Sequence, residues 1–250
     1  MAHPRDRLIT LFGRKPVLEA LEDRTTPVRR VFLAQGARGE IVDRIRALAK
    51  ERGVELRLES AERVSRISKR PKQDQGVAAD VDAPSHLSLE EWVASAPISA
   101  KLIAIDGVTT PANVGMIVRS AAVLGLQGVL LPRRGSPEIS PSVIKASAGV
   151  ALRAPVLRCG TLAEGLEPLR AAGFRAYGLD DARGEPLDAI APPPRAVFVL
   201  GNESEGIAPA HLPLIDAWAR IPMARAGDSL NVACAASIVA YELARRAARG

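Results

Sequence analysis

The 250-residue sequence is poor in cysteine and in aromatic residues, and it contains no long apolar run. Its two cysteines, Cys159 and Cys234, lie far apart and outside any paired ligand spacing, so we expect neither a disulfide framework nor a zinc site. No stretch approaches the roughly 20 apolar residues of a membrane-spanning helix, and the opening MAHPRDRLIT lacks the apolar segment of a signal peptide. These absences favour a folded cytoplasmic protein.

Aromatic residues make up 3% of the chain, which disfavours a nucleic-acid binding mode based on stacking of bases. Charge is unevenly distributed. Residues 1–75 contain 18 Lys and Arg against 11 Asp and Glu, a net of +7, and the remaining residues contain 16 against 17, a net of −1. A basic segment beside a neutral one favours a phosphate-rich partner for the first part of the chain. An ordinary solvated, arginine-rich surface is the alternative.

The first part of the chain alternates short strand patterns with amphipathic helical patterns. Residues 39–52 place Ile41, Ile45 and Leu48 on one helical stripe, which predicts a helix. A second, shorter helix is predicted at 61–67, and strands are predicted at 28–34, 54–58 and 76–81. The basic tract SKRPKQDQG (68–76) has no apolar period and is expected to be an exposed loop, in contact with RNA or merely solvated.

Residues 82–99 are rich in proline and serine and predict a connector. We therefore divide the chain into a domain at 1–80, a linker at 81–99 and a second domain at 100–250. The second domain repeats a strand–helix pattern, which predicts an α/β fold with a largely parallel sheet covered on both faces. Its predicted strands are 101–106, 128–132, 155–159, 175–180 and 195–201, and its predicted helices are 112–126, 140–152 and 161–173.

Three polar segments follow predicted strands, where parallel sheets usually bind their ligands. They are Asp106–Arg119 (DGVTTPANVGMIVR), Leu200–Gly206 (LGNESEG) and Ile221–Asn231 (IPMARAGDSLN). In the first, Asn113 is expected to open a helix that carries Arg119. In the third, Asp228 or Ser229 is expected to cap the alanine-rich last helix. Taken singly, Ser229 could be only a helix cap and Arg119 only a surface residue.

Together and in this order, the segments resemble the three motifs of the SpoU (TrmH-like) branch of the SPOUT methyltransferases. The matching residues are Asn113-Val-Gly-Met-Ile-Val-Arg119, Gly201-Asn-Glu-Ser-Glu-Gly206, and Ile221-Pro-Met with Ser229-Leu-Asn-Val232. The N-terminal GRKPVLEAL and QGVAADV segments are similar to the L30-like substrate-recognition domain of the 23S rRNA guanosine 2′-O-methyltransferase subgroup. The resemblance covers nearly the whole chain.

This resemblance implies a C-terminal SPOUT domain with a deep trefoil knot, S-adenosylmethionine (SAM) as cofactor, no metal, and a homodimer formed through the C-terminal domain. Ala233, Ala235, Ala236 and Ala240 would let the last helix approach a partner subunit, although they could equally pack inside one subunit. The implied reaction is methylation of a ribose 2′-hydroxyl of structured RNA, most readily 23S rRNA, with tRNA as the alternative.

The resemblance also implies roles for individual residues. Arg119 matches the proposed catalytic arginine, but its guanidinium stays protonated near neutral pH. We therefore expect it to grip a phosphate or to stabilise the developing alkoxide, and we expect Glu203 to be partly shielded from water. The predicted catalytic residues are Asn113, Arg119, Glu203, Ser229 and Asn231. The predicted cofactor-binding residues are Gly201, Asn202, Ile221, Met223 and Leu230. The predicted RNA-binding residues are Arg29, Arg30, Arg66, Lys69, Arg70 and Lys72.

Two other classes of protein fit the sequence less well. A non-catalytic RNA-binding or ribosome-assembly factor of the same fold would have no need of the reactive residues Arg119, Glu203, Ser229 and Asn231. A nucleotide-binding dehydrogenase would carry a G-x-G-x-x-G turn after its first strand, and this chain has none there.

Overall fold

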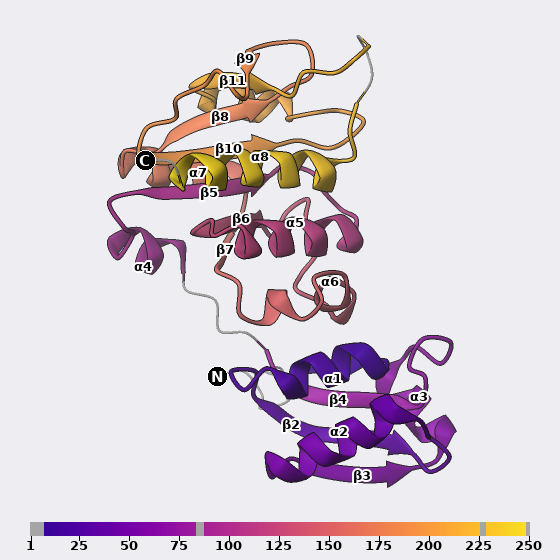
Figure 1. Cartoon of the computed structure of the whole chain (residues 1–250). Helices are drawn as coiled ribbons and strands as arrows, with labels where there is room; N and C mark the ends of the chain where they lie inside the picture. The colour runs from indigo at the N-terminus through magenta and orange to yellow at the C-terminus, as the bar shows by residue number, and fades with distance from the viewer. Residues whose placement is uncertain (1–7, 84–87, 226–228, 249–250) are drawn as a thin grey trace. The chain divides into compact units, whose positions relative to one another are not determined.

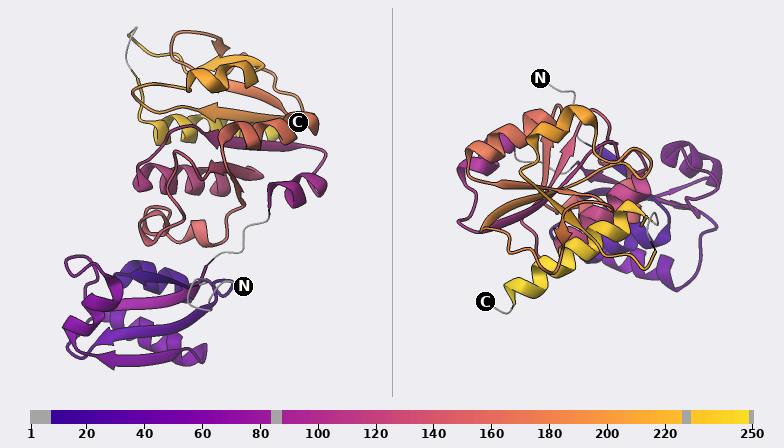
Figure 2. Two further views of the ribbon diagram at one scale, coloured as in Figure 1. Left: turned by 180° about the vertical axis from the view of Figure 1, so that it is seen from behind. Right: turned by 90° about the horizontal axis from the view of Figure 1, so that it is seen from above.

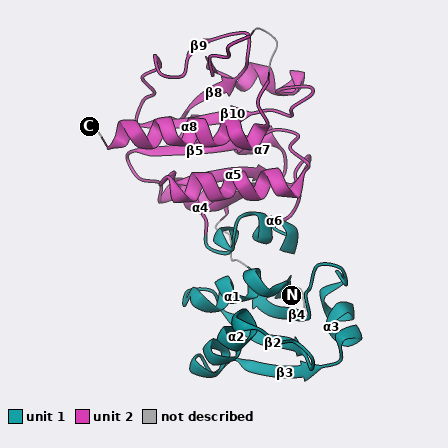
Figure 3. Ribbon diagram, turned by 45° about the vertical axis from the view of Figure 1, so that its right-hand side comes forward, with its two compact units in different colours: residues 1–85, 139–153 teal, residues 86–138, 154–250 magenta. Residues whose placement is uncertain are grey.

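The computed structural model describes residues 8–83, 88–225 and 229–248 of the chain. They fall into two compact units (Figure 3). Unit 1 comprises residues 1–85 with 139–153, and unit 2 comprises residues 86–138 with 154–250. Each unit has its own sheet and its own hydrophobic cluster. Residues 139–153 therefore group with the N-terminal part of the chain, although they lie within the segment predicted as the second domain.

Unit 1 is built on a four-stranded sheet with the strand order β1-β4-β2-β3. Strands β4, β2 and β3 are labelled in Figure 1. Strand β4 is antiparallel to both of its neighbours, whereas β2 and β3 are parallel. Its strands are β1 (Leu8–Phe12), β2 (Val28–Ala34), β3 (Glu55–Glu59) and β4 (Val77–Asp82). Its first three helices are α1 (Arg14–Glu22), α2 (Glu40–Glu51) and α3 (Ala61–Ser68).

Five of these elements were predicted from the sequence, each within one residue of its observed ends. On α2, Ile45 and Leu48 are buried as expected, and Ile41 is half-buried. Strand β1 and helix α1 were not predicted. The first turn of α1 gives little local signal, because Gly13 precedes it without a side-chain cap and Pro16 is its third residue.

Unit 2 contains a seven-stranded parallel sheet with the order β7-β6-β5-β10-β8-β11-β9. This confirms the predicted α/β class with a parallel sheet. The strands are β5 (Ala100–Ile105), β6 (Gly128–Pro132), β7 (Val156–Cys159), β8 (Arg175–Leu179), β9 (Glu185–Pro186), β10 (Arg195–Leu200) and β11 (Ala217–Arg220). The helices are α4 (Leu89–Ala94), α5 (Pro111–Val123), α7 (Leu162–Ala171), η3 (Pro209–Leu214) and α8 (Val232–Ala247).

Helices cover both faces of the seven-stranded sheet, with α7 and α8 on opposite faces (Figure 2). Leu102 and Ala104 of β5 belong to the hydrophobic cluster that includes α4 and α7. Helices α5 and α8 pack side by side, and α8 contacts β5 and β10. The central strands are therefore buried on both faces, which explains the nearly continuous apolar run of β10.

The helix predicted at 140–152 is interrupted. Helix α6 spans only Pro141–Ala146 and is followed by the short 3-10 helix η2 (Val150–Leu152). Ala148 and Gly149 adopt left-handed backbone angles, with φ of 50° and 76°, which a right-handed helix does not accommodate. The hydroxyl of Ser147, which is fully buried, accepts a hydrogen bond from Ala151 N and so fixes the break.

Within the described ranges, no helix is both long enough and apolar enough to cross a membrane. The knotted path of the chain in unit 2 stays a prediction. The parallel sheet matters for function because its carboxyl edge gathers the loops described next.

Candidate active site

Four loops of unit 2 follow strands of the parallel sheet at its carboxyl edge. Residues 106–110 follow β5, residues 180–184 follow β8 and residues 201–206 follow β10, and the described residues 221–225 and 229–231 follow β11. Ligands of open parallel sheets bind at this edge, because the loops of neighbouring strands converge there. The three sequence motifs thus lie at one edge, together with a fourth loop that the motifs did not indicate.

A cavity of about 320 Å³ lies among the loops that follow β8, β10 and β11. This volume is within the range of small-molecule sites. The five residues predicted to bind the cofactor all line the cavity: Gly201, Asn202, Ile221, Met223 and Leu230. Two residues of the predicted catalytic set, Glu203 and Ser229, line it as well.

Three predicted catalytic residues form a hydrogen-bonded group, here called the Asn–Glu–Asn cluster (Asn113, Glu203 and Asn231). Asn113 Nδ2 donates to Glu203 Oε1 at 2.6 Å. Asn231 Nδ2 donates to Asn113 Oδ1 at 3.2 Å and lies 3.5 Å from the same Glu203 oxygen. The cluster therefore joins one residue from each of the three sequence motifs.

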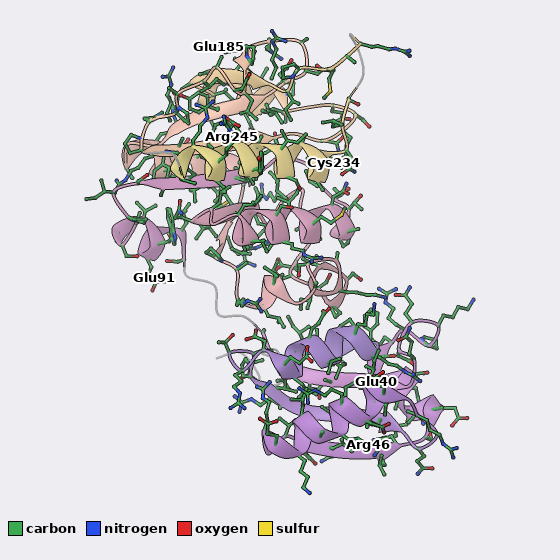
Figure 4. All side chains as sticks on the ribbon, in the orientation of Figure 1. Glu40, Arg46, Glu91, Glu185, Cys234 and Arg245 are labelled. Carbon is green, nitrogen blue, oxygen red and sulfur yellow. The ribbon has the colours of Figure 1, made fainter. Side chains whose placement is uncertain are left out.

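Asn231 has a second role, as the N-cap of α8. Its Oδ1 accepts a hydrogen bond from Ala233 N at 2.9 Å. The prediction that Ser229 caps this helix is therefore wrong, and Asp228 lies outside the described residues. Because Oδ1 is engaged with the helix, the amide group of Asn231 is oriented with its nitrogen toward the cluster. Cys234, in the first turn of α8, marks this end of the helix in Figure 4.

The two ends of the cluster differ in burial. Asn113 is buried, with 7% of its surface exposed, and it is the third residue of α5, which begins at Pro111. Glu203 is exposed, so the expected partial shielding of this carboxylate is wrong. It stands in the loop 201–206, in which Gly201 and Asn202 are half-buried and residues 203–206 are exposed. Among the described residues, its Oε2 oxygen has no hydrogen-bond partner and is available to a bound hydroxyl.

Arg119 does not join the cluster. It is exposed on α5, and the described part of the chain offers it no hydrogen bond or ion pair. Six residues separate Arg119 from Asn113, which corresponds to a rotation of about 600°, or 240° beyond one full turn, on an α-helix. The two side chains therefore leave α5 in different directions, and Arg119 is not among the residues that line the cavity.

Asn202 holds in place the loop 201–206, which follows β10 and lines the cavity. Its Nδ2 donates to Gly107 O at 2.9 Å, and its Oδ1 accepts from Ser204 N at 2.8 Å. Its backbone pairs with that of Gly206 in both directions. A Cβ on Gly201 would lie 2.1 Å from the backbone carbon of Gly206, so only glycine fits at position 201. Asn202 thus ties the first motif to the second.

An additional contact at this edge, between Asp106 and His211, was missed by sequence reasoning. Asp106 is buried at the end of β5, and its Oδ2 accepts from Ala208 N and contacts His211 Nδ1, both at 2.8 Å. These contacts fix the segment that follows the second motif. The position of Asp106 directly after a strand was the only available signal.

The loop after β8 was also missed. Asp180 Oδ2 accepts from Arg183 Nε at 2.8 Å, and its Oδ1 accepts from the backbone N–H groups of Ala182 and Arg183. Burial alone would raise the pKa of Asp180, but these hydrogen bonds outweigh burial and leave the pKa lowered. Asp180, Asp181 and Arg183 all line the cavity.

In unit 1, the predicted RNA-binding residues differ in their surroundings. Arg29 forms an ion pair with Asp82, and Arg30 forms one with Glu55 at 2.6 Å. The remaining four are exposed and have no ion pair with a described residue: Arg66, Lys69, Arg70 and Lys72. The structure thus separates two engaged arginines from four available cations.

Two segments of the chain match known families. Residues 100–241 match the SpoU rRNA methylase family, and residues 10–87 match the substrate-binding domain of RNA 2′-O ribose methyltransferases. This chain belongs to the SpoU methylase family. The SpoU segment contains every predicted catalytic and cofactor-binding residue, and the substrate-binding segment contains every predicted RNA-binding residue.

Individual relatives and solved structures agree with this assignment. An uncharacterised tRNA/rRNA methyltransferase of Mycobacterium tuberculosis is 33% identical over 250 residues, which cover 98% of this chain and 76% of the relative. The crystal structure of an rRNA methyltransferase from Sinorhizobium meliloti is 25% identical, with a TM-score of 0.75, and the match covers 97% of this chain and 88% of that one. AviRb from Streptomyces viridochromogenes, a SpoU methyltransferase crystallised with AdoMet, shares the fold at 24% identity and a TM-score of 0.80, covering 98% and 92% of the two chains.

Proposed function

We propose that this SpoU protein is a SAM-dependent methyltransferase that methylates a ribose 2′-hydroxyl of structured RNA. The observation that carries the proposal is the Asn–Glu–Asn cluster beside a cavity lined by all five predicted cofactor-binding residues. Family membership supports the reaction class, and the match of residues 10–87 to a 2′-O ribose methyltransferase domain supports ribose as the acceptor.

The cavity fits a nucleoside cofactor. Its lining combines apolar side chains, such as Ile221, Met223 and Leu230, with the backbone of the tight Gly201–Gly206 loop. Bound SAM would supply an electrophilic methyl group. Apolar side chains can hold a purine ring, and backbone groups near Gly201 can hydrogen-bond to its edge. AviRb was crystallised with AdoMet, which supports the same cofactor for this chain.

The cluster would position the ribose. Asn113 and Asn231 both direct N–H groups to Glu203 Oε1, which holds the carboxylate in place. Glu203 Oε2 is then free to accept a hydrogen bond from a sugar hydroxyl, and Ser229 lines the same cavity. Arg119 is exposed and has no hydrogen-bond or ion-pair partner among the described residues, which suits a role in gripping an RNA phosphate or stabilising a developing alkoxide rather than in removing a proton.

RNA would bind to unit 1 through a group of cations here called the basic edge: Arg14, Lys15, Arg38, Lys69, Arg70 and Lys72. None of the six has an ion pair with a described residue. Arg14, Lys15 and Arg38 were not predicted from the sequence. These three residues can be recognised as part of a basic surface only from the fold, which brings together segments that are far apart in the chain. The predicted residues Arg29, Arg30 and Arg66 are not part of this group, and their role in RNA binding stays a prediction.

Hydrogen bonds define this edge. Gly13 N donates to Val77 O at 3.0 Å, and Ala34 N donates to Gly76 O at 2.9 Å. Arg14 Nε donates to Gln75 O at 3.4 Å. The start of α1, the loop after β2 and the basic loop at 69–76 therefore meet. The nearby carboxylate of Asp74 is buried and bonded to Ser65 and Ser68, so it offsets little of the surface charge.

We also propose that the protein forms a homodimer through α5 and α8. These neighbouring helices expose the apolar side chains of Met116, Val123, Ile238 and Tyr241. The alanines that suggested a dimer from the sequence are buried within unit 2: Ala233, Ala235, Ala236 and Ala240. The alternative of internal packing therefore holds for these alanines, and a second copy would cover the exposed apolar side chains instead.

Ribosomal RNA is the proposed substrate, because the matched family is the SpoU rRNA methylase family. The resemblance of the N-terminal segments to the 23S rRNA subgroup makes 23S rRNA the first candidate. Transfer RNA is the alternative, since relatives are named tRNA/rRNA methyltransferases. Incubation of the protein with tritiated SAM and total RNA, followed by mapping of 2′-O-methyl sites, tests both. Label in one RNA at a ribose is expected, with or without EDTA. RNA binding without transfer would instead identify a non-catalytic RNA-binding factor.

A further inference from the structure

Arg183 lies in the loop after β8 and is held from two sides. Its Nε donates to Asp180 Oδ2 at 2.8 Å, and its guanidinium carbon lies 4.1 Å from the centroid of the Trp218 ring. A guanidinium stacked on an indole is a favourable cation–π arrangement. Arg183 and Trp218 both line the cavity. Arg183 is therefore fixed at the cavity wall, although its side chain is 56% exposed.

Two glycines make room for this stack. A Cβ on Gly178 would lie 2.6 Å from the Trp218 ring, and a Cβ on Gly184 would lie 2.4 Å from the Trp218 backbone carbonyl. Trp218 of β11 is paired in register with Gly178 of β8. The position of the ring, and with it the position of Arg183, thus follows from the pairing of two strands of the rigid sheet.

The arrangement leaves the outer edge of the guanidinium available. Arginine has five N–H donors, and in Arg183 one of them, Nε–H, is bonded to Asp180. The face of the guanidinium is stacked on Trp218. Among the described residues, neither Nη atom has a hydrogen-bond partner. Two parallel N–H groups with fixed geometry match a carboxylate, which they can bind in a bidentate manner.

The charges of the cavity wall restrict the ligand group that would bind there. Arg183 is the one cation among the described residues that line the cavity, and the acidic lining residues are Asp180, Asp181, Glu203 and Glu205. Asp180 is already engaged by Arg183, whereas Asp181 is exposed and has no ion pair within the described part of the chain. The Arg183 guanidinium thus lies two residues along the chain from the Asp181 carboxylate, and neither its Nη groups nor that carboxylate has a partner among the described residues. A positive and a negative group in one loop match the two charges of an amino-acid zwitterion.

We propose that Arg183 recognises the α-carboxylate of the amino-acid tail of SAM, and that Asp181 recognises its α-amino group. This inference rests on SAM being the cofactor. It makes the loop after β8 the part of the cavity that distinguishes SAM and S-adenosylhomocysteine from nucleosides without the amino-acid tail.

Calorimetric titration with two probes tests this assignment. S-adenosylhomocysteine carries the amino-acid tail, and methylthioadenosine has the same nucleoside and sulfur without it. Arg183→Gln is expected to weaken S-adenosylhomocysteine binding by about tenfold and to leave methylthioadenosine binding unchanged, since only the former has a charged partner to lose. Arg183→Lys, which keeps the charge but loses the fork, should lie between the two. Asp181→Asn should weaken S-adenosylhomocysteine alone.

Arg175→Gln is the matched control. Arg175 is an exposed arginine of β8 that stacks on Tyr177 at 5.3 Å but does not line the cavity, so both affinities should stay unchanged. Equal losses for both probes in Arg183→Gln, or no loss for either, would overturn the inference. Asp181→Asn alters an exposed side chain and so keeps the test decisive if Arg183→Gln misfolds. Binding of neither probe by the unaltered protein would remove the cofactor assignment, and the inference with it.

Discussion

Asn113 donates a 2.6 Å hydrogen bond to Glu203, a residue 90 positions away in the sequence. The bond joins the first turn of α5 to the loop after β10, so it exists only because β5 and β10 are neighbours in the sheet. One partner is buried and the other is exposed. A buried amide thereby orients an exposed carboxylate, which is a suitable arrangement for positioning a substrate hydroxyl.

Glu203→Gln is expected to lower the methyl-transfer rate by about one to two orders of magnitude while leaving SAM affinity nearly unchanged. Gln keeps the size of the side chain, and its amide oxygen can still accept from Asn113. An uncharged NH2 group then takes the place of the free carboxylate oxygen, and this group cannot accept a hydrogen bond from a hydroxyl. Single-turnover kinetics and calorimetry measure the two quantities separately. Glu185→Gln, at an exposed residue of β9, is the control. Parallel losses of rate and affinity would reassign Glu203 to cofactor binding.

Arg119→Ala is expected to abolish most of the RNA methylation without changing the stability of the protein. Arg119 is exposed and has no partner in the described part of the chain, so its loss should change the free energy of unfolding by less than about 0.5 kcal/mol. If Arg119 grips a phosphate, the residual activity and that of Arg119→Lys should keep the pH dependence of the unaltered enzyme. Disappearance of a pH limb in both variants would identify Arg119 as the proton acceptor.

The position of the three motifs directly after strands of a parallel sheet predicts that they meet at one edge, whereas the individual residues of the site were predicted from the resemblance to SpoU methyltransferases. Asn113, Glu203 and Asn231 follow three strands, and parallel strands place their carboxyl ends at one edge. Which side of a helix each residue occupies is harder to anticipate where one motif spans most of the helix. Asn113 and Arg119 belong to one motif, yet one is buried and the other is exposed.

Other features depend on tertiary contacts that leave no local trace in the sequence. The stack of Arg183 on Trp218 joins the loop after β8 to strand β11, and the polar run DDAR alone suggests only a turn. The break after α6 arises at Ala148, a residue that ordinarily favours helix. The alanines of α8 could face a partner or the core, and only the burial within unit 2 decides between these.

Glu242 is expected to stabilise the protein in an acid-sensitive way. Hydrogen bonds from Arg245, opposed by burial and aided by Arg246, lower the pKa of Glu242 from 4.5 to about 2. Since the pKa of Glu242 is lower in the folded state, the unfolded state binds the proton more readily. The stability that Glu242 contributes is therefore complete above about pH 4.5 and is lost as the pH falls toward 2. Thermal unfolding between pH 5 and 2 should therefore depend less on pH in Glu242→Gln.

The matched control for Glu242 is Glu167→Gln, an exposed residue of α7 without an ion pair to a described residue. Asp23 also has a pKa lowered to about 2, because hydrogen bonds from Thr25, Thr26 and Arg153 outweigh its burial. The pH dependence in Glu242→Gln should therefore shrink rather than vanish. An unchanged dependence would show that the Glu242 ion pairs do not persist in solution.

The basic edge of unit 1 is expected to determine how strongly RNA affinity depends on salt. Replacing Lys69, Arg70 and Lys72 with Gln should reduce the slope of log affinity against log salt concentration by about 2 to 3, since each phosphate contact contributes about 0.7 to 0.9. Filter binding of a structured rRNA fragment at several salt concentrations measures the slope. The loss should be similar for unrelated RNA sequences, because phosphate contacts carry no sequence information.

A variant with the same charge change tests whether position or net charge is responsible. Arg29, Arg30 and Arg57 are exposed or half-buried arginines of unit 1, and each forms an ion pair with Asp82 or Glu55. To reach a phosphate they must first leave these carboxylates, so their replacement with Gln should change the slope much less. Equal slopes in the two triple variants would mean that RNA responds to the total charge of unit 1, and the basic edge would then lose its status as the RNA-binding surface.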